Sequence, residues 1–196
     1  TTLVSIAEDT PSSSNPGSSI QTLFGSRFSD ARDAVSGGSS ANTLLGVALT
    51  ANNATSAEGS WQWLNGSTWV SIVPSLSDSN ALFLSATTSL RFAPAPNYNG
   101  TPGELTARLV DSSTSHSNGA FISVATGGGS TAYSATTLNL GTSISPVNDP
   151  PTISATTPST TLVEDSANTA TITLTKGDVD GTASYDTSYL TSNGWS

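Results

Sequence analysis

The chain has 196 residues and a formal net charge of −9, yet only 10% of its residues are charged, so its acids stand out against a neutral background. This balance makes cations the expected partners and excludes nucleic acid, whose phosphates would be repelled. The absence of cysteine excludes disulfides and thiolate metal sites, and the absence of methionine leads us to expect a piece of a longer protein.

Short β-type runs alternate with turn-rich stretches through most of the chain. The strands expected before the proline-rich segment are Leu3–Ala7, Thr43–Thr50, Ser60–Leu64, Thr68–Val73, Ala81–Ser85, Ser89–Ala93, Glu104–Val110, Ala120–Ala125 and Ala132–Ser143. The pair Asn65-Gly66 lies between two aromatic runs and predicts a tight hairpin turn. No segment shows a convincing helical period, and no apolar run approaches the roughly 18 residues of a membrane span. The pattern predicts an all-β fold, an antiparallel Greek-key sandwich.

The segment Ser145–Pro151 predicts a joint between two β-domains. Asn148 and Asp149 supply oxygen ligands, and the two prolines that follow stiffen the backbone. We expect a sandwich over residues 1–146, a Ca²⁺-binding joint over 147–151 and a partial second β module over 152–196. The first domain is large enough to bury about two-thirds of its unfolded surface. The second is near the lower size limit, so we expect it to be completed by sequence beyond residue 196 or by an inserted domain.

The second module has its own strand-like runs, and it echoes the first. The runs are Thr152–Ser154, Thr161–Val163 and Thr169–Thr175. The echoes pair Ile6–Asp9 with Leu162–Asp165, and Ser29–Asp33 with Gly177–Gly181. An apolar strand, a Glu-Asp pair and a later pair of aspartates therefore occur twice, which indicates two modules of one superfamily.

Several longer motifs carry a resemblance to a known family. They are Phe28–Asp30, Asn42–Ala48, Gly59–Trp63, Leu90–Pro94, Asn97–Gly103, Leu105–Asp111 and Val147–Pro151. With them the chain resembles the cadherin-like and bacterial Ig-like repeats of giant RTX-type surface adhesins. This resemblance implies an extracellular module on a bacterial cell surface, joined to adjacent repeats of the same chain. In that family most modules are spacers, and a few bind sugars, ice or peptides.

Four groups of oxygen-bearing side chains are candidate Ca²⁺ ligands. They are Glu8 with Asp9, Asp30 with Asp33, Asp111 alone, and Asn148 with Asp149, the last partnered by Glu164, Asp165, Asp178 and Asp180. The resemblance implies interdomain Ca²⁺ at Asn148, Asp149, Asp178 and Asp180. The alternative for each group is a turn former or a solvated charge, which is the reading we favour for a lone aspartate such as Asp78.

The sequence departs from the commonest repeat in two loops, and both bear on function. Asp33 is followed by a flexible insert, Ala34–Ser40, and the loop Ser112–Thr131 contains Gly127, Gly128 and Gly129. We expect these loops to form a Ca²⁺-lined pocket that binds a carboxylate of a peptide or protein ligand. The expected ligand-binding residues are Asp30, Asp33, Ser36, Gly37, Asp111, Gly127, Gly128 and Gly129.

Two other functions stay open at this point. A structural spacer would use Ca²⁺ only to stiffen the joint, and a lectin would use the tryptophans, although Trp61 and Trp63 share the face that a sandwich usually buries. An enzyme is not expected, because the single histidine, His116, lies in a polar loop with no cysteine to activate. The expected partners are a peptide, protein or glycan on a host or neighbouring cell and the adjacent repeats of the same chain. We expect the chain to be a monomer, to bind no nucleic acid and not to insert into a membrane.

Overall fold

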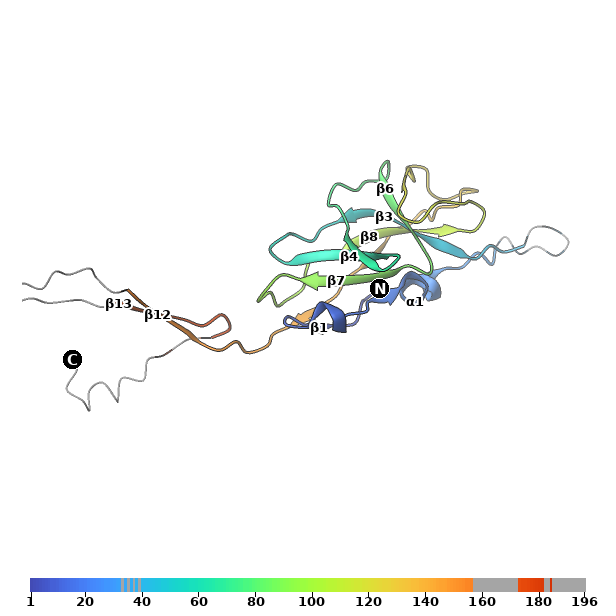
Figure 1. The fold of residues 1–196 in the computed structure, drawn as a ribbon. Helices are drawn as coiled ribbons and strands as arrows, with labels where there is room; N and C mark the ends of the chain where they lie inside the picture. Colours follow the sequence, from blue (N-terminus) through green and yellow to red (C-terminus); the bar gives the residue numbers. More distant parts are fainter. Residues whose placement is uncertain are drawn as a thin grey trace, which may run out of the picture. The chain divides into compact units, whose positions relative to one another are not determined.

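The computed structural model describes residues 1–32, 34, 36, 38, 40–156, 173–181 and 184. The chain divides into two compact units, Thr1–Pro146 and Val147–Ser196. The division falls at the start of the proline-rich segment. Figure 1 shows the strands of the first unit gathered in two layers.

The first unit is built from two antiparallel sheets. One sheet has the strand order β10-β8-β3-β6-β9 and the other β2-β7-β4-β5. The strands of the first sheet are β3 (Leu44–Asn52), β6 (Ala81–Ser85), β8 (Leu105–Asp111), β9 (Phe121–Ile122) and β10 (Leu138–Leu140). Those of the second are β2 (Ser18–Ser19), β4 (Gly59–Asn65), β5 (Thr68–Ser71) and β7 (Ser89–Pro94). The predicted all-β sandwich is thus confirmed.

A third, short ladder joins the two ends of the unit. Strand β1 (Ile6–Ala7) pairs in parallel with β11 (Ile144–Ser145), with Ile6 opposite Ile144 and Ala7 opposite Ser145. This ladder ties the first residues of the unit to its last, and it places Glu8 beside the exit of the chain.

The core between the sheets is aromatic and aliphatic. Trp61 is fully buried, packs edge-on against Phe92 with ring centroids 5.2 Å apart, and donates its indole N–H to the Gly103 carbonyl at 2.8 Å. Trp63 is also buried, and its ring lies against Gly119, where a Cβ would come within 2.7 Å of it. Both tryptophans of this hairpin strand therefore face the core, as the alternation predicts.

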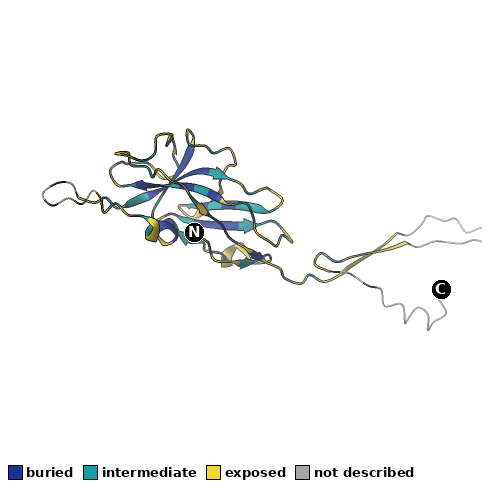
Figure 2. Ribbon diagram, turned by 180° about the vertical axis from the view of Figure 1, so that it is seen from behind, coloured by how far each residue is buried: buried dark blue, intermediate teal, exposed yellow. Residues whose placement is uncertain are grey.

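The five-stranded sheet is apolar on its outer face as well. A second cluster of buried residues comprises Ala48, Ala81, Phe83, Val110 and Val124, with Leu45, Ile122 and Tyr133 packed against it. Figure 2 shows buried segments on the strands and exposed ones on the loops around them. The loops after β8 therefore have an apolar surface to cover, and this fixes their position over the sheet.

Two elements differ from the sequence analysis. Of the single strand expected over residues 132–143, only β10 (Leu138–Leu140) is a strand, and residues 132–134 pair only locally with β8, as at Val110 and Tyr133. The short helix α1 (Ile20–Phe24) was not predicted, since five residues cannot display a helical period. The Ser19 side chain caps it by accepting from the Thr22 N–H at 3.1 Å. Single 3-10 turns occur at η1 (Ser12–Ser14) and η2 (Gly25–Arg27).

The second unit contributes one described hairpin. Strands β12 (Thr152–Thr156) and β13 (Thr173–Gly177) pair antiparallel, with Thr152 opposite Gly177, and all their residues are exposed. The expected run over residues 161–163 lies outside the described residues.

Candidate functional site

A cleft of about 330 Å³ lies beside the β10 edge of the five-stranded sheet. It is lined by residues 27–30, by Leu109 and Asp111 of β8, and by residues 128–129, 131–136 and 138. Four residues expected to bind a ligand are among them: Asp30, Asp111, Gly128 and Gly129. Segments far apart in the sequence thus meet at one hollow in the surface.

Asp30 is held where the inserted loop returns to the sheet. Its Oδ2 accepts a hydrogen bond from the Asn42 backbone N–H at 2.6 Å, which closes the loop. The Ser112 hydroxyl in turn accepts from the Thr43 N–H at 3.0 Å and contacts Asn42 Oδ1 at 3.4 Å. Because Leu44 lies opposite Asp111 in the pairing of β3 with β8, these contacts bring Asp30 and Asp111 to the same end of the cleft.

Asp111 ends β8 and begins the next turn. Its Oδ1 accepts from the N–H of Ser113 at 2.7 Å and also from the Ser113 hydroxyl. Asp30 and Asp111 are both half-buried. Among the described residues, the structure records no hydrogen bond to Oδ1 of Asp30 or to Oδ2 of Asp111. Each carboxylate therefore holds its loop with one oxygen and keeps the other for a further contact.

The glycine-rich wall is closed by its own hydrogen bonds. Gly128 and Gly129 have φ angles of 85° and 63°, which favour glycine. The Gly128 N–H donates to the Tyr133 carbonyl at 2.7 Å, and the Thr131 hydroxyl donates to the Gly128 carbonyl at 2.8 Å. The expectation that glycine amides face a ligand therefore does not extend to the Gly128 amide, whose hydrogen is used inside the loop.

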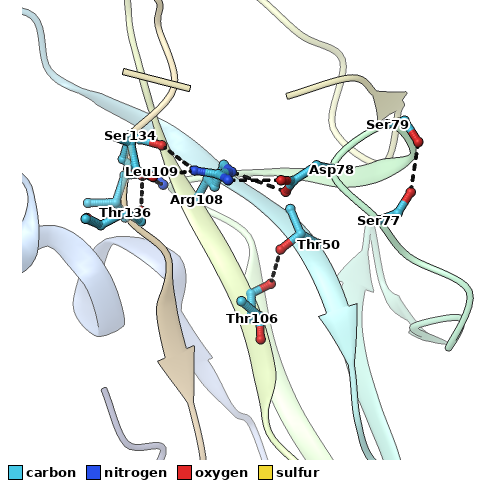
Figure 3. A network of polar contacts seen from close by, with 10 residues as sticks. Thr50, Ser77, Asp78, Ser79, Thr106, Arg108, Leu109, Ser134 and Thr136 are labelled. Atoms are coloured by element: carbon cyan, nitrogen blue, oxygen red, sulfur yellow. Dashed lines mark hydrogen bonds and ion pairs between the residues drawn. The ribbon is translucent and has the colours of Figure 1, made fainter. Parts of the chain in front are cut away.

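Arg108 fixes the same wall from the outer face of the sheet (Figure 3). Its Nη1 donates to the carbonyls of Ser134 and Ala135 at 2.9 and 2.7 Å. Its Nε and Nη2 donate to the two carboxylate oxygens of Asp78 at 3.2 and 2.9 Å. The hydrogen bond from Arg108 lowers the pKa of Asp78, against the opposing effect of burial.

This network was missed at the sequence level. Asp78 is expected to be a turn former or a solvated charge; it does lie in the turn between Ser77 and Asn80, but it is also the ion-pair partner of Arg108. The alternation of β8 places Arg108 on the face opposite Leu109, which indicates a need for polar partners there. It does not say which aspartate meets the guanidinium. Gly127, also expected at the site, lies beneath this wall: a Cβ there would be 2.7 Å from the Ser134 carbonyl oxygen and 3.0 Å from Arg108 Nη1.

His116 contacts the cleft indirectly. Its Nε2 lies 3.0 Å from the Tyr133 hydroxyl, and its ring packs on Phe83 with centroids 5.2 Å apart. Tyr133 lines the cleft. The imidazole thus belongs to the packing behind one wall.

The remaining residues expected at the cleft lie elsewhere. Ser36 is exposed in a turn of the insert and does not line the cleft. Asp33 and Gly37 lie outside the described residues.

Within the second unit, three of the expected joint acids come together. The Asp149 N–H donates to Asp180 Oδ2 at 2.6 Å, and Asp178 Oδ1 accepts from the N–H groups of Asp180 and Gly181 at 3.1 and 3.0 Å. Asn148 is exposed, and its side-chain amide donates to the Asp149 carbonyl at 3.1 Å. Glu164 and Asp165, the other expected ligands, lie outside the described residues.

At the far end of the first unit, Glu8 is buried and Asp9 is exposed. The Glu8 N–H donates to the Ser145 carbonyl at 3.1 Å, and the Asn99 side-chain amide lies 3.4 Å from Glu8 Oε2. A buried carboxylate is costly unless its oxygens have partners, so this position is a specific environment and not a solvated surface.

Across the described ranges, no three histidine or acidic side chains form a group able to hold a metal by themselves. The donors at each place are carboxylate and amide oxygens, the type that Ca²⁺ prefers, and Ca²⁺ also accepts backbone carbonyls and water. The donor chemistry therefore fits Ca²⁺. No helix in the described part of the chain is long and apolar enough to cross a membrane.

Comparison of the chain with protein-family models, with curated proteins and with solved structures finds no match.

Proposed function

We propose that this chain is a non-catalytic, Ca²⁺-dependent adhesion module that binds a peptide or protein ligand in the cleft. One observation carries the proposal: Asp30, Asp111, Gly128 and Gly129 come from distant segments and line the same hollow. In keeping with the resemblance described above, the module belongs on a bacterial cell surface, in series with other repeats of the same chain.

The cleft offers a ligand a predominantly polar lining with a smaller apolar part. Phe28, Leu109, Tyr133 and Leu138 give it an apolar part, and the two aspartates give it a charged end. Ligand sites are commonly concave, and their polar groups fix the orientation of the ligand. A peptide side chain can occupy the apolar part while a charged group of the same peptide meets the aspartate end.

Asp30 and Asp111 would hold Ca²⁺ at that end. Bound there, Ca²⁺ would supply a positive charge with coordination positions open to a carboxylate from outside. The two side chains have a fixed base for this role, because the hydrogen bonds from Asn42 and Ser113 orient them before any ligand arrives. Preorganised groups lose less freedom on binding, which favours affinity.

The test is isothermal titration of the chain with a library of peptides that carry free carboxyl termini, in millimolar Ca²⁺ and then in EDTA. We expect sub-millimolar binding that requires Ca²⁺ and is lost in the double variant D30N/D111N. The matched control is E104Q, at an exposed acid that neither lines the cleft nor belongs to the candidate Ca²⁺ ligands. If no peptide binds in Ca²⁺, or if D30N/D111N binds as well as the unaltered chain, this proposal is wrong.

A spacer is the second candidate, supported by the hydrogen-bonded acids Asp149, Asp178 and Asp180 of the second unit. A spacer would stiffen in Ca²⁺ and bind no ligand. Small-angle scattering in Ca²⁺ and in EDTA, beside the titration above, separates the two. The lectin reading loses its main support, because Trp61 and Trp63 are buried in the core.

A further inference from the structure

We propose that Arg27 is a second anchor of the cleft and that the ligand is an acidic peptide segment, one of whose side-chain carboxylates pairs with this guanidinium. The inference rests on the proposed function and specifies the ligand of the same cleft. It follows from the position of Arg27 in the cleft and from the absence of a hydrogen bond or ion pair between its side chain and any described residue.

The fold fixes the backbone position of Arg27, but its side chain makes no hydrogen bond or ion pair with the described residues. It is the last residue of η2, and the next residue, Phe28, is extended, with φ −86° and ψ 135°, and packs against the core. The side chain of Arg27 is exposed, lines the cleft, and has no hydrogen bond or ion pair with any described residue. A guanidinium offers five donors that suit a carboxylate, so this position can capture one from outside.

The other arginines either have internal partners or lie away from the cleft. The chain contains five basic residues in all. Arg91 is buried, stacks 4.1 Å from the ring centroid of Trp69, and donates to Gln62 at 2.8 Å. Arg108 is committed to Asp78 and to two backbone carbonyls. Arg32 is exposed and does not line the cleft. Arg27 is thus the cation that the cleft offers.

Charge complementarity decides the kind of partner. With a net charge of −9, the chain as a whole repels an acidic peptide. Attraction must therefore be local, and Arg27 supplies it beside the apolar lining. Asp30, where Ca²⁺ is proposed, is three residues further on, so the two backbone positions are at most about 10 Å apart.

We use that upper limit to design a ligand motif. Three residues of extended peptide also span about 10 Å. A ligand whose terminal carboxylate lies at the aspartate end can therefore place an aspartate or glutamate side chain, about three residues upstream, on Arg27. The residues between them would face the apolar lining.

The test is fluorescence polarisation with labelled peptides that have a free carboxyl terminus and two randomised central positions, in millimolar Ca²⁺. The position three residues upstream is aspartate, asparagine or lysine. We expect the chain to bind the aspartate series about fivefold more tightly than the asparagine series, a preference that corresponds to an ion pair of about 1 kcal/mol. R27E should reverse the order in favour of the lysine series, and R32E, the matched control, should leave it unchanged.

The outcomes separate this inference from the proposed function. If the three series bind equally to the unaltered chain, or if R27E keeps the preference for aspartate, the Arg27 anchor is refuted while peptide binding stands. If no series binds in Ca²⁺, both are refuted. If a glycan that carries carboxylates binds through Arg27 and the peptides do not, the assignment to a peptide is refuted. The thermal unfolding midpoint of R27E should stay close to that of the unaltered chain, because the Arg27 side chain makes no hydrogen bond or ion pair with any described residue.

Discussion

Replacement of Arg108 by methionine tests how the cleft wall is held. The change keeps most of the aliphatic stem and removes the four hydrogen bonds to Asp78, Ser134 and Ala135. The companion variant D78N removes the negative charge and one of the two acceptor oxygens that face Arg108, and it leaves the bonds to the wall in place. The two variants therefore divide the network into its ion pair and its backbone contacts.

The burial of each contact sets its expected contribution to the free energy of unfolding. The Asp78 side chain is 42% exposed, so the ion pair is screened by water and contributes about 0.5–1 kcal/mol. The bond to Ser134 is part-buried and the bond to Ala135 exposed. As charge-assisted bonds that leave carbonyls without partners when broken, they add about 1–2 kcal/mol together. We therefore expect R108M to lower the free energy of unfolding by about 1.5–3 kcal/mol.

The assay is thermal and urea unfolding followed by tryptophan fluorescence. For a unit of 146 residues, each kcal/mol shifts the midpoint by about 2–4 °C, so R108M should lose about 3–12 °C and D78N about 1–4 °C. R32M, at an exposed arginine that precedes the insert, is the control and should change stability by less than about 0.5 kcal/mol. Equal losses for R108M and D78N would show that the contacts to Ser134 and Ala135 stabilise nothing.

Three further predictions follow from the same structure. Because Arg108 lowers the pKa of Asp78, the contribution of the pair is complete above the unfolded pKa of about 4 and is lost as pH falls through the folded value; the difference in unfolding free energy between the unaltered chain and D78N should therefore shrink to zero in acid. G119A should cost about 2–4 kcal/mol in urea unfolding, because φ is 84° and a Cβ would lie 2.7 Å from the Trp63 ring, whereas G66A, with φ 62° and no atom within 4 Å, should cost about 1 kcal/mol; similar losses would contradict the packing argument. If Ca²⁺ binds with a Kd near 10⁻⁴ M, about 10 mM Ca²⁺ stabilises the chain by about 2.7 kcal/mol per site, so EDTA should lower the melting midpoint measured by calorimetry, and an unchanged midpoint would contradict Ca²⁺ binding.

The sequence predicts the sandwich well because its strands alternate. β6 has the expected bounds, and β3, β4, β7 and β8 differ from them by at most two residues at either end. A short helix and the true extent of β10 depend on tertiary contacts, which no local period reports. The second apolar face of the five-stranded sheet had a signal that was not used. The four residues Ala81–Leu84 are all apolar, a run that is typical of a strand buried on both sides.

The candidate site was predictable in part, and the reason is chemical. Oxygen ligands and glycines can be recognised one residue at a time, so Asp30, Asp111 and Gly128 could be proposed from the sequence. Arg27 and Arg108 could not be told apart at that level, since a basic residue looks the same whether its partner is internal or absent. Only the fold shows that one guanidinium is fully engaged and the other is not.

Strand β8 contributes residues to the cleft from one face and the Arg108 side chain from the other. Leu109 and Asp111 line the cleft, while Arg108, on the opposite face, holds the carbonyls of Ser134 and Ala135 in the cleft wall. If the cleft binds a peptide, R108M should weaken binding and stability together, because the wall moves. D111N should weaken binding with little loss of stability, because the Ser113 amide can still donate to the oxygen of the new side chain. A chain in which binding is insensitive to both variants would have its ligand elsewhere, and the loops over β8 would then serve only to cover the apolar face of the sheet.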